Sequence, residues 1–95
     1  MTNNVQHDAD VRQFFSVVDG TRCVLDYQLQ GSRMTITHIG VPDALAGRGI
    51  AGALTETALK HARTAGWKVL PACSYAAAYF MRHREYDDLL DNAQA

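Results

Sequence analysis

The chain has 95 residues and a formal net charge of −1, with 47% hydrophobic and 20% charged residues. These values predict one globular domain over residues 1–95, and they exclude a disordered chain and the strongly basic surface of a nucleic-acid-binding protein. No apolar run is long enough to cross a membrane, and the first residues lack the apolar core of a secretion signal. Two cysteines are too few for a disulfide scaffold, so we expect a reduced, cytoplasmic compartment.

The first half of the chain predicts an antiparallel sheet. Residues 1–10 are polar, and we expect them to be frayed. Three apolar runs follow, and the turn signals Asp19-Gly20 and Gly31-Ser32 separate them. They span residues 11–18, 22–30 and 33–41. They predict a three-stranded meander.

Alternation assigns side chains to the two faces of this sheet. In the second run the apolar residues share one face, as in a half-buried strand: Cys23, Leu25, Tyr27 and Leu29. In the third run one side carries Met34, Ile36 and His38. The other side carries Thr35, Thr37, Ile39 and Val41.

The second half of the chain changes to helical spacing. Residues 42–49 form a loop, and from Ile50 apolar residues recur at helical intervals until Gly66, a residue typical of the position just past a helix. Residues 67–70 predict a short strand, and residues 74–84 a second helix. A strand–helix–strand unit this short implies a right-handed crossover and a parallel pair. We therefore expect an α+β fold: an antiparallel meander whose last pair is parallel, with two main helices packed against it.

The loop "AGRGIAGAL" precedes the long helix. The first turn of a helix has unpaired backbone N–H groups, which attract anions together with the helix dipole. Gly47 and Gly49 let a phosphate approach the backbone closely, and Arg48 adds a positive charge. The pattern fits a pyrophosphate site, but glycine-rich turns that only begin a helix are common, so the loop alone does not decide between them.

Four motifs in one order resemble a known family. They are "H-x-x-V-P" from His38 to Pro42, "GRGIA", "V-x-P-x-C-S-Y" from Val69 to Tyr75, and "RHREY" from Arg82 to Tyr86. With the glycine loop, the chain resembles the GNAT acetyltransferase superfamily, and within it the minimal N-acetyltransferase-like family marked by a shared Cys and Gly. The superfamily signature, Arg/Gln-x-x-Gly-x-Gly/Ala, falls on residues 46–51, with alanine in place of the leading Arg or Gln.

The resemblance implies a GNAT-like fold with a splayed parallel strand pair, and an acetyl-CoA site without a metal. The pyrophosphate would lie on the backbone of Gly47, Arg48, Gly49, Ile50, Ala51 and Gly52. The pantetheine arm would pair with the backbone of Ile39, Gly40 and Val41, and the thioester would lie in the gap between the splayed strands. Ser74 and Tyr79 are further candidate contacts to acetyl-CoA. Relatives often carry Glu at the position of Gly40.

Cys73 and His38 are the candidate catalytic residues. A thiol at the start of a helix is biased toward thiolate, so Cys73 can accept the acetyl group and pass it on. Alternatively the acceptor amine attacks directly, and Cys73 only shapes the pocket or relays a proton. A further alternative is that Cys73 is a small buried apolar residue without a functional role. Histidine suits proton transfer near neutral pH, which makes His38 the candidate base; the alternative is a half-buried strand histidine.

Other polar residues have two interpretations each. Tyr75 and Tyr79 lie four apart on one helical face, where they protonate a thiolate or pack with polar tips. Ser74 is expected to cap the second helix. Residues 82–84, Arg-His-Arg, meet CoA phosphates or complement the helix dipole. We expect two further histidines at the surface: His7 and His61.

Together these features predict an acetyl-CoA-dependent N-acetyltransferase acting on an amine acceptor. The alternative is a non-catalytic acetyl-CoA- or CoA-binding module that acts with a partner protein. Only Asp19-Gly20-Thr21 connects the first two strands, where full-size relatives insert helices that form much of the acceptor site. The acceptor groove is then open, or a second subunit or partner completes it; an open groove suits a protein or peptide amine. The sequence does not define the oligomeric state.

Overall fold

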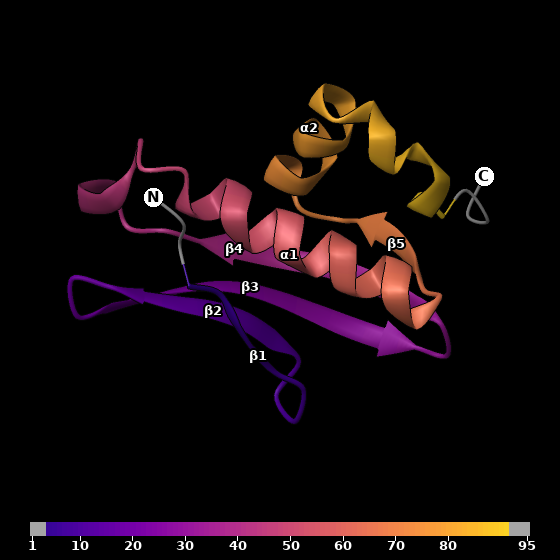
Figure 1. Cartoon of the computed structure of the whole chain (residues 1–95), viewed down its shortest axis with the longest axis horizontal. Helices are drawn as coiled ribbons and strands as arrows, with labels where there is room; N and C mark the ends of the chain where they lie inside the picture. Colours follow the sequence, from indigo (N-terminus) through magenta and orange to yellow (C-terminus); the bar gives the residue numbers. More distant parts are fainter. Residues whose placement is uncertain (1–3, 92–95) are drawn as a thin grey trace.

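Five strands form one mixed sheet in the order β1-β2-β3-β4-β5 in the computed structural model, which describes residues 4–91 (Figure 1). The first four strands form an antiparallel meander, and the fifth is parallel to β4. Their bounds are β1 Gln6–Asp8, β2 Gln13–Val18, β3 Thr21–Gln30, β4 Arg33–Gly40 and β5 Lys68–Pro71. The α-helices are α1 Ile50–Ala65 and α2 Ser74–Arg82, and the 3-10 helices are η1 Asp43–Leu45 and η2 Arg84–Leu89. This arrangement confirms the expected α+β fold.

The helix α1 connects the two parallel strands, as the expected crossover requires. It begins after Gly49 and ends at Gly66, and both glycines have the left-handed backbone conformation, with φ of 77° and 78°. Its buried face carries leucines and alanines at helical spacing, which confirms the predicted boundaries and the predicted amphipathic pattern. At α2, however, Cys73 occupies the N-cap position and Ser74 is already helical, so the expectation that Ser74 caps this helix is wrong.

A single core joins the sheet to both helices. Figure 1 shows α1 lying along the sheet, with α2 above β5. We call the face of the sheet that packs against the helices the inner face and the opposite one the outer face. Side chains from the inner face and from both helices belong to one buried cluster, whose fully covered members include Phe14, Leu25, Met34, Ile36, Leu54, Leu59 and Val69. The predicted inward face of β3 is confirmed, because Cys23, Leu25 and Tyr27 are buried.

A β-bulge in β4 changes the expected faces of that strand. Asp26 pairs with His38 and Tyr27 pairs with Ile36, so Thr37 is the extra residue. Beyond the bulge, Ile39 lies opposite the buried Leu25 and packs against the core, whereas His38 is exposed. The expectation that His38 shares a face with Ile36 is therefore wrong, because the bulge inserts one residue and shifts the alternation.

The strand β1 lies in the segment that we expected to be frayed. His7 pairs with Phe14 across the two strands, and the two rings stack with centroids 4.0 Å apart. His7 Nε2 also lies 2.6 Å from the Tyr27 hydroxyl, and His61 meets His7 edge-on. The expected surface positions of His7 and His61 are wrong, since both rings are half-buried in this aromatic cluster. Residues 1–3 lie outside the described part of the chain.

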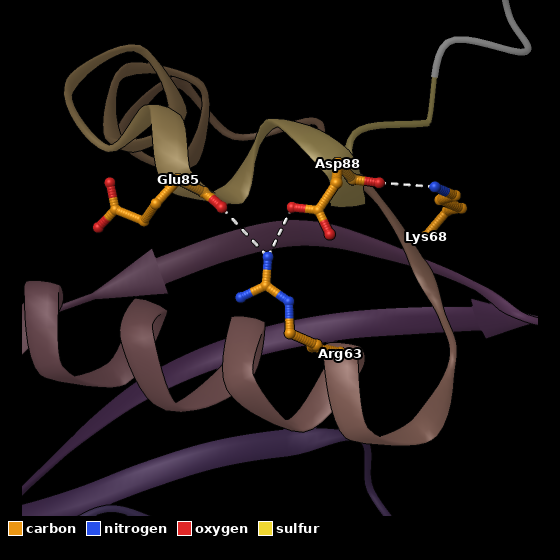
Figure 2. A network of polar contacts seen from close by, with 4 residues as sticks. All are labelled: Arg63, Lys68, Glu85 and Asp88. Atoms are coloured by element: carbon orange, nitrogen blue, oxygen red, sulfur yellow. Dashed lines mark hydrogen bonds and ion pairs between the residues drawn. The ribbon is translucent and has the colours of Figure 1, made fainter.

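The C-terminal helix η2 is held against the end of α1 and against β5 by a polar network (Figure 2). Arg63 donates hydrogen bonds to the Glu85 carbonyl at 3.1 Å and to the Asp88 carboxylate at 2.6 Å. Lys68 donates to the Asp88 carbonyl at 2.6 Å. The polar contacts therefore tie together three segments that are distant in the sequence.

Candidate functional site

The parallel strands β4 and β5 separate before β4 ends. Their pairing runs from Arg33 and Lys68 to Ile36 and Pro71, and the N–H groups of Ala72 and Cys73 then both donate to the Ile36 carbonyl, at 3.0 and 3.1 Å. From there β4 continues to Gly40 and pairs with β3 alone, while the segment after β5 turns into α2. The expected splay is therefore present, and it leaves one edge of the last residues of β4 without a strand partner among the described residues.

A hollow of about 270 Å³ lies where the glycine loop meets the start of α1, and we call it the glycine-loop hollow. The residue just after β4, the loop, the first helical residues and one tyrosine of α2 form its wall. Its lining residues are Val41, Leu45, Ala46, Gly47, Gly49, Ile50, Ala51, Gly52 and Tyr75. Most of the residues that we expected beneath a pyrophosphate are therefore in this wall.

The backbone at the glycine-loop hollow suits an anion. The first N–H groups of a helix have no intrahelical partner, and here they belong to residues 50–52 of the wall. The first turn of α1 contains no acidic side chain that would repel a phosphate. At Gly49 no atom lies within 4 Å of the position that a Cβ would occupy, so a packing contact does not account for glycine there. The left-handed backbone conformation does.

Arg48 lies in the same loop but outside this lining. Its guanidinium forms an ion pair with Asp19 at 2.9 Å, and both side chains are largely exposed. Asp19 belongs to the tight turn between β2 and β3, so this ion pair connects the glycine loop to the neighbouring hairpin. A phosphate that bound to Arg48 would compete with the Asp19 carboxylate.

The two candidate catalytic residues lie apart. Cys73 is half-buried at the N-cap of α2 and packs against the core. His38 lies on the outer face, where its ring covers Gly40. Cys73 does not belong to the lining of the glycine-loop hollow. The structure therefore does not bring the thiol and the imidazole together, contrary to what a paired nucleophile and base would require.

The two tyrosines of α2 have different surroundings. Tyr75 lines the glycine-loop hollow, whereas Tyr79 is buried one turn farther along and stacks on His83 with ring centroids 4.0 Å apart. Burial, followed by the nearby Glu56 carboxylate, raises the pKa of Tyr79 to about 12, so its phenol stays protonated. Sequence spacing placed both tyrosines on one face and offered no signal for which of them borders the hollow.

The basic residues 82–84 do not converge on one site. Arg82 lies over the Tyr75 ring at 5.9 Å, His83 stacks on Tyr79, and Arg84 pairs with Asp87 at 2.8 Å.

Within residues 4–91, no group of three or more His, Cys, Asp or Glu side chains is arranged to hold a metal ion. The helices of this part of the chain are too short or too polar to span a bilayer.

The sequence also matches known proteins. The family model described as GCN5-related N-acetyl-transferase matches residues 13–89, so the chain belongs to the GCN5-related N-acetyltransferase family. Protein NATD1 of Mus musculus is 38% identical over 78 residues, which cover 79% of this chain and 71% of that protein. Protein NATD1 of Homo sapiens is likewise 38% identical, with 69% of that protein covered.

A solved structure shares the fold. The solution structure of a GCN5-like protein from Staphylococcus aureus matches with a TM-score of 0.75 and 24% identity, covering 96% of this chain and 91% of that one. The expected family and the expected fold are both confirmed. Acetyl transfer is accordingly the reaction class of this chain at the level of the family.

Proposed function

We propose that this protein is an acetyl-CoA-dependent N-acetyltransferase that acts on an amine acceptor. The glycine-loop hollow carries the proposal, because a helix N-terminus without acidic residues lies there beside the part of β4 that has separated from β5. Gly47 through Gly52 would hold the pyrophosphate on backbone N–H groups. The unpartnered edge of β4 at Ile39 and Gly40, together with Val41 just after the strand, would pair with the amides of the pantetheine arm.

The chemistry requires a nucleophile, a proton acceptor and a leaving group. Bound acetyl-CoA supplies an activated acetyl thioester. The nitrogen of the acceptor amine forms the new C–N bond, the thioester C–S bond breaks, and CoA leaves as a thiolate. His38 takes the proton that the nitrogen loses, and the Tyr75 phenol in the wall of the hollow gives a proton to the thiolate.

Direct attack by the amine is favoured over transfer through Cys73. A base within hydrogen-bond reach is one means of activating a cysteine for the covalent route, and His38 is the candidate base here. Cys73 packs on the core side, and the candidate base His38 lies on the outer face. We infer that Cys73 borders the thioester without accepting the acetyl group.

The acceptor that we propose is a protein or peptide amine. The connection between β2 and β3 is a tight turn at Asp19-Gly20, so no inserted helix covers the neighbouring surface there. An amine on a protein or peptide can approach this open side, whereas a small metabolite would make few contacts with the protein there.

Two measurements on the full chain test the function. Calorimetric titration compares acetyl-CoA, CoA and the phosphate-free thioester acetylpantetheine, and mass spectrometry follows acetylation of a set of peptides. We expect both CoA forms to bind at least about tenfold more tightly than acetylpantetheine, and acetylated peptide to form. Failure of both CoA forms to bind would contradict the proposal, and binding without transfer would favour a module that acts with a partner.

The Cys73→Ala variant tests the route. Direct attack predicts that this variant binds acetyl-CoA and keeps most of the transfer rate. It also predicts that the wild-type chain shows no acetyl adduct on Cys73 by intact mass after incubation with acetyl-CoA. Loss of transfer with retained binding would assign the thiol to the chemistry.

A further inference from the structure

Gly40 differs from the glycines that have positive φ. The glycines of the turns and of the glycine loop have positive φ and nothing within 4 Å of a Cβ position, so their backbone conformation explains them. Gly40 does not have a positive φ, and a Cβ at this position would lie 2.9 Å from His38 Nε2. Real Cβ atoms essentially never come so close to another heavy atom. At Gly40 the missing side chain matters because the imidazole occupies its space.

The backbone of His38 is fixed by its neighbours on the outer face. The bulge at Thr37 turns His38 outward, and the Thr37 hydroxyl donates to the Asp26 carbonyl at 3.3 Å. Asp26 pairs with His38 across the strands, and Gln13 holds its carboxylate with a hydrogen bond of 2.7 Å. The strand and its neighbours therefore set which way His38 leaves the backbone, and the room above Gly40 sets where its ring lies.

We propose that Gly40 is a positioning residue for His38. A hydrogen in place of a side chain lets the imidazole lie along β4 toward the end of the strand, beyond the point where β5 has separated. In that position the ring lies on the outer face over the end of β4, and the proposed function has the acceptor amine approach on this face. This inference rests on the proposed function, because it makes the His38 ring the acceptor-side base whose direction Gly40 determines.

The variant Gly40→Ala tests the inference. The added methyl group would meet Nε2, so the flexible His38 ring must swing away from the strand. We expect kcat for peptide acetylation to fall about tenfold or more, because a small misplacement of a catalytic group is costly. The KM for acetyl-CoA should change less than about twofold, since the substitution moves the base and leaves the glycine-loop hollow as it is.

A double-mutant cycle separates positioning from other roles of Gly40. In the His38→Ala background the imidazole is absent, so Gly40→Ala should then have almost no further effect on kcat. If Gly40 instead served the close approach of the pantetheine arm, the same substitution would raise the KM for acetyl-CoA equally in both backgrounds. Equal losses in the two backgrounds would overturn the proposal.

Two readouts do not depend on turnover. Nuclear Overhauser effects between the His38 ring and the Gly40 α-protons should be present in the wild-type chain, and the ring should lose its contact with residue 40 in Gly40→Ala. Modification of His38 by diethylpyrocarbonate should be at least about twofold faster in the variant, because the ring is freed from the strand. Absence of the wild-type contact overturns the inference even if transfer is observed. Presence of the contact with no transfer to any amine overturns the proposed function instead.

Discussion

At the scale of single residues, two glycines with the same left-handed conformation allow the effect of a substitution on stability to be distinguished from its effect on acetyl-CoA binding. Gly49 and Gly31 have φ of 77° and 60°, and a Cβ would have no neighbour within 4 Å at either position. We expect Gly49→Ala and Gly31→Ala to lower the free energy of unfolding by a similar amount, about 1 kcal/mol, because both place alanine in the left-handed region. Only Gly49→Ala should weaken acetyl-CoA binding, since Gly49 lines the glycine-loop hollow.

Urea denaturation measures the first effect of these two substitutions, and calorimetric titration measures the second. The Gly31→Ala variant is the matched control, because it has the same strain in a turn between β3 and β4. Equal acetyl-CoA affinities of the two variants would contradict the assignment of the glycine-loop hollow to the pyrophosphate.

The ion pair between Arg48 and Asp19 gives a second prediction about single residues. Asp19→Asn keeps a residue that tolerates the left-handed turn conformation, where Asp19 has φ of 51°, and removes the charge that holds Arg48. We expect acetyl-CoA to bind about two- to fivefold more tightly, the range that an exposed pair can account for.

The effect of Asp19→Asn should shrink at high salt, which screens exposed charges. Asp43→Asn is the matched control, because it removes one carboxylate from η1, next to the same loop, without releasing Arg48. If both variants tightened binding equally in parallel titrations, the gain would come from net charge and the specific competition would be refuted.

Elements were predictable where one local pattern determined them. The long helix was predicted correctly because helical spacing and Gly66 both lie within the segment itself. The strand β1 was missed because its stability comes from His7 stacking on Phe14, a contact that hydropathy does not report. The predicted face of His38 was wrong because the position of the bulge at Thr37 depends on how β4 pairs with β3. Pairing between strands is a tertiary property that alternation within one strand cannot encode.

The docking of β1 should depend on pH. Burial and the neighbouring His61 lower the pKa of His7 from its ordinary value of 6.5, and the adjacent Asp8 opposes them. The unfolded chain therefore binds a proton at a higher pH than the folded chain does. The stability that neutral His7 confers is complete above its unfolded pKa and is lost as the pH falls through that value toward the lower folded pKa.

The variant His7→Phe tests this dependence, because it keeps a ring on Phe14 and cannot titrate. We expect the loss of unfolding free energy between about pH 7.5 and about pH 5.5 to be smaller in the variant than in the wild-type chain. Urea denaturation at both pH values measures it, and hydrogen exchange of the β1 amides locates it. An identical pH dependence of the two proteins would show that His7 does not control the strand.

The contact between η2 and α1 gives a prediction for a second element. Arg63→Ala removes the two hydrogen bonds drawn in Figure 2. It also removes the guanidinium that lies 5.2 Å from the centre of the Tyr86 ring. Because the network is partly exposed, we expect a loss of about 1 kcal/mol in unfolding free energy. Lys60→Ala is the control: it removes only an exposed pair with Glu56 on the same helix, worth about 0.3 kcal/mol. Equal losses in urea denaturation would show that η2 docks without Arg63.

At the scale of the whole molecule, some parts of the candidate site could be predicted from the sequence and others could not. The glycine loop is a local motif, so most of the hollow's lining was predictable. The pair between Arg48 and Asp19 joins two separate loops, and the outward position of His38 depends on how β4 pairs with β3 at the bulge, so no local pattern indicated them. The separation of Cys73 from His38 likewise follows from which side of the sheet each occupies.

The open side of the molecule leads to the final prediction. The sheet's outer face carries no helix among the described elements, and the β2–β3 connection is a tight turn. Under the proposed function, an acceptor would gain affinity by spreading over the surface around His38, which a peptide can do and a free amino acid cannot. We expect kcat/KM for peptide amines to exceed that for the corresponding free amino acids by about tenfold or more, measured by mass spectrometry of the acetylated products. Peptides whose amines are already acetylated serve as the control for non-enzymatic modification. Equal kcat/KM values for peptides and free amino acids would mean that a small acceptor finds all its contacts inside the site, and the open-groove interpretation would then be wrong.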